Sequence, residues 1–143
     1  MLIKQISVFV ENRVGKLAEI LSVFKEEAID IRALSVADTT DFGIFRLIVS
    51  DPERAYRVLK EAGCTVSVTK VLAVEVADQP GGLNQITQLM ANSNISVEYI
   101  YAFISQMKNK AYVILKVNDA QKAIEVFSEN QIRLLTEQEG YEL

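Results

Sequence analysis

The sequence of 143 residues has no histidine, no tryptophan, one cysteine and two prolines. Without histidine there is no imidazole for acid–base catalysis, and one cysteine cannot build a zinc cluster, a disulfide framework or a multi-cysteine iron–sulfur site. We therefore expect no metal ion, no cofactor and no catalytic residue. Cys64 stands alone, and we expect it to act as a small buried hydrophobe.

Positive charge is also scarce, because 15 lysine and arginine residues stand against 19 acidic residues, for a net charge of -4. This balance opposes the attraction to phosphate that non-specific nucleic-acid binding requires, so we expect no nucleic-acid partner. The longest stretch without a formal charge, residues 79–97, contains Pro80 and many amide and hydroxyl side chains, so we expect no membrane span. Lys4 and Glu11 leave no room for the apolar core of a signal peptide, which predicts a cytoplasmic protein.

The chain does contain a repeat, and half of its residues are hydrophobic, which is enough for a globular core. Residues 12–31 match residues 78–97 at an offset of 66, and residues 47–61 match residues 115–129 at an offset of 68. The two extra residues of the second copy fall between Gln106 and Lys110, where we expect a hairpin turn. We therefore predict two domains, residues 1–69 and residues 70–143.

Each copy reads as strand, helix, strand, strand, helix, strand. Apolar residues alternate at Ile6, Val8 and Val10, which predicts a strand, and the helical spacing after residue 16 predicts an amphipathic helix. Asp51 followed by Pro52 is typical of a helix start. This order predicts an α+β fold of two ferredoxin-like units side by side, each with two helices on one face of an antiparallel sheet.

No flexible linker separates the two copies. Alternation of apolar residues continues through the junction at Val66, Val68, Leu72, Val74 and Val76, with only Lys70 interrupting it. We therefore expect the two units to be rigidly placed against each other.

The sheet face that points away from the helices is too apolar for water. If Phe45, Leu47 and Val49 face the helices, the opposite face carries Ile44, Arg46, Ile48, Phe9, Leu34 and Val36. We expect the same face of another molecule to cover it, which predicts a homodimer through the sheet faces.

Two loops between strand and helix are the candidate binding sites: ENRVGKL at residues 11–17 and ADQPGGL at residues 77–83. In each, a glycine precedes a helix whose free amide hydrogens would donate hydrogen bonds to a carboxylate. Asn12 and Asp78 offer an acceptor for an ammonium group, and Asp30 and Ser96 begin the second strand of each copy. A purely structural interpretation stays open, in which Asn12 and Asp78 cap helices and the glycines only make turns.

This repeat, with a loop of the form Asn/Asp-x-Pro-Gly-x-Leu, resembles the ACT domain, and the chain resembles a tandem ACT protein of the amino-acid-binding type. Residues 78–83 fit the loop fully, whereas residues 11–17 are similar to the loop of the regulatory domain of phosphoglycerate dehydrogenase. That resemblance implies that an effector contacts Asn12 and, from the neighbouring unit, Asp30. Val14 replaces the usual loop proline, and Asp30 stands where that enzyme's domain has an asparagine.

The family resemblance further implies that the two units pair through their second strands into one eight-stranded sheet. Effector grooves would then be lined by residues 12–17 with 96–98, and by residues 78–83 with 30–32. The candidate ligand-binding residues are Asn12, Arg13, Val14, Gly15, Lys16, Leu17, Asp30, Ile31, Asp78, Gln79, Pro80, Gly81, Gly82, Leu83, Ser96 and Val97. The tail, residues 136–143, is expected to be a solvated end.

We interpret the chain as a non-catalytic regulatory protein that binds a free amino acid between its two units and modulates an enzyme of amino-acid metabolism in trans. A structural or regulatory subunit without a ligand is an alternative, and so is a small enzyme on a ferredoxin-like scaffold. RNA binding on the sheet is a further alternative, which the negative net charge disfavours.

Overall fold

The computed structural model describes residues 1–11, 13–38, 41–105 and 107–143. Asn12, a candidate ligand-binding residue, and Gln106, at the expected insertion, lie outside the described residues. The elements are β1 (Ile3–Glu11), α1 (Lys16–Glu26), β2 (Ile31–Asp38), β3 (Phe42–Val49), α2 (Pro52–Glu61), β4 (Thr65–Ala77), α3 (Gly82–Asn92), β5 (Val97–Ala102), β6 (Lys110–Val117), α4 (Ala120–Glu129) and α5 (Glu137–Glu142).

One long strand, β4, belongs to both halves of the molecule. Its first half pairs with β1 and its second half with β6, so the six strands follow the order β2-β3-β1-β4-β6-β5. We call β1 to β3, α1, α2 and the first half of β4 the first unit, and the remainder up to α4 the second unit. The predicted junction without a linker is confirmed. Because β4 continues through residues 69 and 70, a domain boundary at that point stays a prediction.

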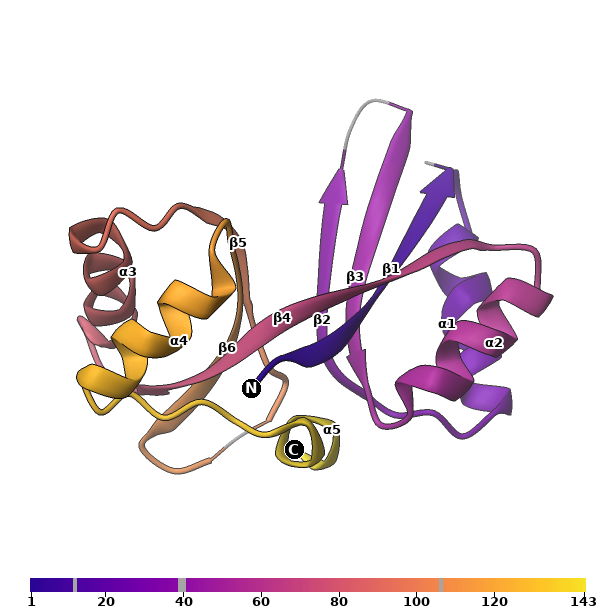
Figure 1. Ribbon diagram of the computed structural model, residues 1–143. Coiled ribbons are helices and arrows are strands. Elements are labelled where there is room, and N and C mark those ends of the chain that lie inside the picture. Colours follow the sequence, from indigo (N-terminus) through magenta and orange to yellow (C-terminus); the bar gives the residue numbers. More distant parts are fainter. Residues whose placement is uncertain (12, 39–40, 106) are drawn as a thin grey trace.

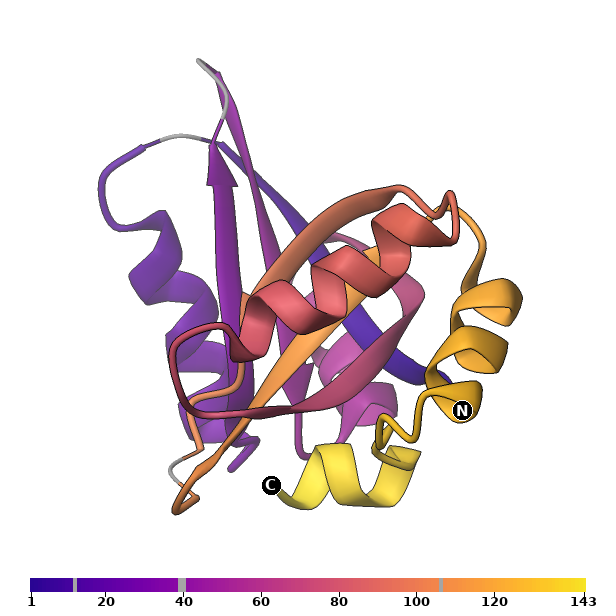
Figure 2. The ribbon, with the colours of Figure 1, turned by 90° about the vertical axis from the view of Figure 1, so that its left-hand side faces the viewer.

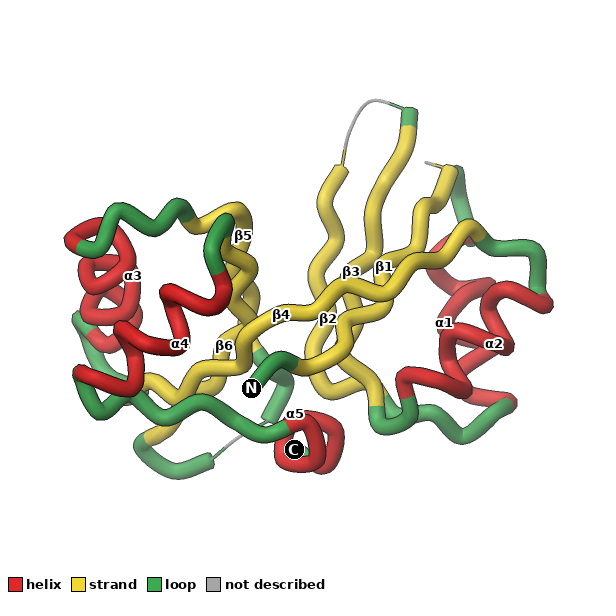
Figure 3. The backbone as a smooth tube through the Cα atoms, in the orientation of Figure 1, coloured by secondary structure: helices red, strands yellow, loops and turns green. Residues whose placement is uncertain are grey.

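Each unit buries its helices against one face of its sheet, and Figures 1 and 3 show these helices on the two outer sides of the molecule. The first core includes Ile6, Phe24 and Leu47, and the second includes Met90 and Phe127. Asp51 and Asp119 start α2 and α4 by accepting hydrogen bonds from backbone amides three residues on. The predicted α+β fold of two ferredoxin-like units is confirmed.

The strand registers show which residues lie on the face without helices. Phe9 pairs with Ile44, and Ile44, Arg46 and Ile48 lie on that face as expected. The expectation for Leu34 and Val36 is wrong, because Leu34 pairs with Leu47 and Val36 with Phe45 on the helix side. An irregularity between Ile31 and Ala33 shifts the register of β2, and a shift of one residue turns the later side chains to the other face.

The helix-free faces of the two units pack against each other within the chain. A third core lies between them and includes Ile3, Ile48, Val71, Ile114 and Leu135. Ile3 and Ile48 are fully buried. This corrects the expectation that a second molecule covers the centre of this face.

The sheet curls so that its two outer strands, β2 and β5, meet at one end. Ala33 forms a single bridge with Phe103, and the amide of Ile104 donates to the carbonyl of Arg32 at 2.8 Å. The eight-stranded sheet implied by the family resemblance is therefore wrong for the part of the chain that the structure describes, because the units share β4 and stack their faces instead.

A polar network lies inside the interface between the two faces. The fully buried Gln5 donates from Nε2 to the hydroxyl of Tyr99 at 2.8 Å, and its Oε1 accepts from the hydroxyl of Tyr101 at 2.6 Å. The guanidinium of Arg46 lies 3.8 Å from the centre of the Tyr99 ring. Burial raises the pKa of Tyr101, and the neighbouring Tyr99 raises it further, so this hydroxyl stays protonated and able to donate.

The C-terminal residues form a short helix, which corrects the expectation of a solvated end. Thr136 and Glu139 make a capping box at the start of α5. The backbone amide of Lys4 donates to the hydroxyl of Tyr141 at 2.8 Å, and Nε of Arg32 donates to the carbonyl of Tyr141 at 2.7 Å. The helix thereby fastens the end of the chain to the first unit, and Figure 2 shows it below both units.

Replacement of Tyr101 by phenylalanine should lower the free energy of unfolding by about 1–3 kcal/mol, because the buried Oε1 of Gln5 would lose its donor. Urea unfolding measures this loss. Tyr56→Phe is the matched control, since the Tyr56 hydroxyl only accepts an exposed hydrogen bond from Lys60. Equal unfolding midpoints for the two variants would contradict the role of the network.

The turn from β4 into α3 requires a glycine at position 82. A Cβ at Gly82 would lie 2.0 Å from the carbonyl oxygen of Ala77, whereas Lys16 occupies the equivalent position in the first unit. Gly82→Ala should therefore destabilise the protein by about 3 kcal/mol, and Lys16→Ala by less than about 1 kcal/mol. Thermal unfolding of both variants tests this, and a Gly82→Ala variant as stable as the parent would refute the close approach.

Candidate functional site

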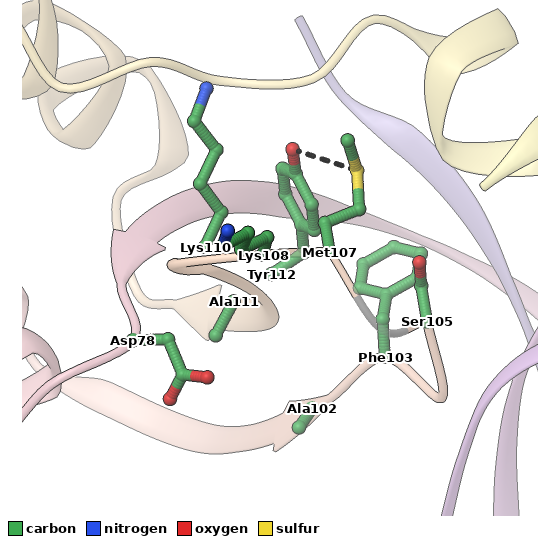
Figure 4. A pocket seen from close by; sticks show the side chains of 9 residues that line it. All are labelled: Asp78, Ala102, Phe103, Ser105, Met107, Lys108, Lys110, Ala111 and Tyr112. Carbon is green, nitrogen blue, oxygen red and sulfur yellow. Dashed lines mark hydrogen bonds between the residues drawn. The ribbon is translucent and has the colours of Figure 1, made fainter.

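A hollow of about 530 Å³ lies beside the second loop, where β4 ends. The loop contributes Asp78, the end of β5 contributes Ala102, and residues 103, 105, 107 and 108 line the hollow before β6 begins. Figure 4 shows the lining residues, which are Asp78, Ala102, Phe103, Ser105, Met107, Lys108, Lys110, Ala111 and Tyr112.

The carboxylate of Asp78 points into this hollow (Figure 4). Its backbone amide donates to the carbonyl of Asn109 at 3.2 Å, which holds the loop against the hairpin. Within residues 1–11, 13–38, 41–105 and 107–143, no hydrogen bond or ion pair engages the carboxylate itself. Asp78 therefore offers an unpaired negative charge at the edge of the hollow.

Two lysines stand on the opposite side of the hollow. Nζ of Lys110 lies 3.2 Å from the carboxylate of Glu75, and its side chain extends away from Asp78 (Figure 4). Lys108 has no ion pair with any residue that the structure describes. Lys108 is therefore the cation that remains available to an anion in the hollow.

The rest of the wall is largely apolar. Phe103 and Tyr112 meet edge to face with ring centres 6.4 Å apart, and both are buried. The Tyr112 hydroxyl donates to the sulfur of Met107 at 3.4 Å. Small side chains at Ala102 and Ala111 leave the space open.

The first turn of α3, which follows Asp78 along the chain, presents unpaired backbone amides. Gly81 is the N-cap residue, with a φ of 88°, and no side chain caps this end, so Asp78 does not have the capping role that the structural interpretation allowed. Among the described residues, no acceptor pairs with the amides of Leu83 and Asn84. The first turn also contains no acidic side chain. This helix end therefore has the partial positive charge that suits a carboxylate.

The first loop differs because its own side chains neutralise one another. Glu19, in the first turn of α1, lies 3.0 Å from Nη2 of Arg13 and 3.5 Å from Nζ of Lys16. Hollows of about 210 and 300 Å³ lie beside this loop, and both include Arg13 and Lys16 in their walls. Val14 is fully exposed, and Gly15 is the N-cap residue of α1.

The candidates on the second strands do not line these hollows. The carboxylate of Asp30 lies 2.9 Å from Nη1 of Arg32 and accepts from the amide of Ile31. The amide of Ser96 donates to the side chain of Asn118, and Val97 follows at the start of β5. The grooves between units that the resemblance implies therefore stay predictions.

Sequence reasoning missed most of the wall of the large hollow. Of the second-loop candidates, Asp78 lines it, whereas Gln79, Pro80, Gly81, Gly82 and Leu83 do not. Met107, Lys108 and Lys110 come from the hairpin between β5 and β6, where the two-residue insertion was recognised only as a turn. The insertion itself was the available signal, because it lengthens the second copy beside the loop that contains Asp78.

No cluster of acidic or cysteine side chains in the described part of the chain is suited to hold a metal ion. Among the same residues, no helix is long and apolar enough to cross a membrane.

The sequence matches a family model described as an ACT domain pair over residues 1–143. The crystal structure of protein BT0572 from Bacteroides thetaiotaomicron is 36% identical, with a TM-score of 0.93, over 100% of this chain and 98% of that one. No curated protein matches the sequence.

Two further structures resemble the fold. The ligand-free regulatory subunit of aspartate kinase from Thermus thermophilus has a TM-score of 0.64 at 15% identity, over 88% of this chain and 91% of that one. The corresponding subunit from Thermus flavus has a TM-score of 0.61 at 15% identity, over 88% and 90%. The match to the family model spans the whole sequence, so the chain belongs to the family of ACT domain pairs.

Proposed function

We propose that this protein is a non-catalytic regulator that binds a free α-amino acid in the hollow beside Asp78. The observation that carries the proposal is the unpaired Asp78 carboxylate at the edge of a hollow of about 530 Å³, in the loop that leads into the uncapped start of α3. A volume of this size lies in the range typical of small-molecule sites.

The charges around the hollow complement the two charged groups of an amino acid. Asp78 would accept hydrogen bonds from the ammonium group. Lys108 would attract the carboxylate, and the partial positive charge at the start of α3, whose residues do not line the hollow, would add to this attraction. Both signs of charge are thus available on one loop and one hairpin.

The apolar part of the wall indicates the class of effector. Ala102, Phe103 and Ala111 offer no charge to an effector side chain, and the Tyr112 hydroxyl is already engaged with Met107. A charged side chain placed against this apolar part of the wall would lose hydration without gaining a partner there. We therefore infer that the effector is an amino acid with an apolar side chain.

The first loop is the weaker candidate for this role. Glu19 already places a carboxylate beside Arg13 and Lys16, and in α3 the equivalent residue is the uncharged Gln85. An effector carboxylate at the first loop would compete with Glu19, so we infer that one effector binds per chain.

Regulation would act in trans on an enzyme of amino-acid metabolism in the cytoplasm. The family assignment and the resemblance in fold to regulatory subunits of aspartate kinase support a regulatory role. We further propose that the two domains are residues 1–69 and 70–143. Effector binding in the second domain would change the surface with which the two domains contact the enzyme.

A thermal-shift screen against the proteinogenic amino acids tests the proposed function. An apolar amino acid present at about 100 times its dissociation constant should stabilise the protein by about 2.7 kcal/mol, because it binds the folded state alone. Calorimetric titration should then give one site per chain. A screen in which no amino acid raises the melting temperature would overturn the proposal.

Asp78→Asn should weaken binding of the amino acid found in that screen by about tenfold or more, because the ammonium group would lose its anionic partner. Stability without effector should not change, since the carboxylate has no partner among the described residues. Asp41→Asn, at an exposed position away from the hollow, is the matched control. Unchanged affinity in Asp78→Asn would exclude this hollow as the site.

A further inference from the structure

The end of the first unit's sheet carries an exposed apolar cluster on its helix-free face, formed by Phe9, Phe42 and Ile44, which we call the aromatic end. Phe9 is 49% exposed and Phe42 is 57% exposed. The registers Phe9 to Ile44 and Glu11 to Phe42 place these residues on the same face. Figure 1 shows the ends of β1, β2 and β3 rising past the second unit, which covers only the rest of this face.

The second unit provides an internal comparison, because it has the same fold and the same register. Glu75 pairs with Tyr112 as Phe9 pairs with Ile44, and Ala77 pairs with Lys110 as Glu11 pairs with Phe42. Position by position, the two phenylalanines of the aromatic end are thus replaced by Glu75 and Lys110.

Those two residues belong to an ion-pair cluster. Nζ of Lys110 lies 3.2 Å from one carboxylate oxygen of Glu75, and Nη1 of Arg133 lies 3.2 Å from the other. Arg133 stands where the first unit has Thr65, which pairs with Phe9. The second unit therefore has three charged side chains at this end, of which Lys110 and Arg133 are about half exposed and Glu75 is 19% exposed.

The comparison shows that this end of the fold does not require apolar residues for its own stability. Two half-exposed phenyl rings nevertheless leave roughly 200 Å² of aromatic surface in contact with water. Exposed aromatic clusters of this kind are typical of protein interfaces. The aromatic end is therefore better explained as a docking surface than as part of the unit's core.

We propose that a second copy of this chain docks on the aromatic end, with the two copies related by a twofold axis. The charges beside the cluster favour a second copy over another partner, because Glu11 and Arg13 form an exposed ion pair 3.9 Å apart, in which Arg13 also contacts Glu19, so both signs of charge are present at this surface. A surface with both signs is complementary to itself when it is turned by a twofold rotation, which sets Glu11 of one copy against Arg13 of the other.

The aromatic end also continues an interface that the chain already has. Arg46 follows Ile44 along β3 on the same face and stacks on Tyr99 of the second unit. The helix-free face is thus covered up to Arg46 by the second unit, and the second copy covers the remainder.

Docking there would also complete the hollow of about 300 Å³ beside the first loop. Its wall includes Phe9, Phe42, Arg13 and Lys16, together with Cys64 and Thr65. A second copy that covers the two phenylalanines supplies the side of this hollow that is now open to solvent. This proposal concerns self-association and does not rest on amino-acid binding by the second unit.

Sedimentation velocity of the full chain over a concentration series tests the proposal. The parent protein should form a dimer, and the variant Phe9→Glu/Phe42→Lys/Thr65→Arg, which grafts the charges of the second unit, should dissociate at least about 100 times more readily. Its circular dichroism should match that of the parent, because the second unit carries the same charges in the same fold.

Ile104→Glu is the matched control, since Ile104 is 62% exposed in the second unit, away from the aromatic end, and its substitution should leave the dimer intact. Phe42→Lys alone, at the more exposed of the two rings, should weaken the dimer about tenfold. This single variant replaces the triple variant in the test if the triple variant does not fold. A parent protein that is monomeric at every concentration would overturn the proposal. So would dimers that survive the grafted charges, or that dissociate equally in Ile104→Glu.

Discussion

The structure depends on one continuous strand that two sheets share. The 13 residues of β4 extend for about 43 Å, and each half supplies a pairing edge to a different unit. A shared strand has no hinge, so the twist and position of one sheet determine those of the other. The two helix-free faces are thereby held opposite each other, and they bury the third core, which neither unit would form by itself.

Most of that third core is apolar, but its polar residues determine how the two sheets are positioned. Aliphatic side chains such as Ile48 and Ile114 pack in many relative positions at similar cost, and so they do not fix how one sheet sits on the other. The amide of Gln5 fixes the relative position of the two sheets, because it has to reach the hydroxyls of Tyr99 and Tyr101 at the same time. No buried side-chain polar atom among the described residues is left without a partner, so this specificity carries no penalty of unpaired groups.

Sequence patterns predicted the features that depend on nearby residues: the repeat, the helix caps at Asp51 and Asp119, and the unbroken alternation of apolar residues along β4. They failed where one local irregularity or a distant contact decides the outcome. The irregularity after Ile31 turned Leu34 and Val36 to the other face, and periodicity cannot tell which sheet an apolar face will meet. The sequence contains the residues of the capping box, Thr136 and Glu139, but the acidic composition of the tail led to the prediction of a solvated end instead. Asp78 was found from its loop motif, whereas the remaining wall of the hollow comes from a hairpin with no motif.

The short C-terminal helix has a consequence for the order in which the chain folds during synthesis. The hydrogen bond between the Lys4 amide and the Tyr141 hydroxyl joins residues 137 positions apart, so Lys4 is synthesised long before its partner. Gly140 packs on Ile3, so the start of β1 is not covered until α5 has left the ribosome. The first unit is thus synthesised before the second but completed after it, and its nascent form exposes an apolar strand end until α5 is made.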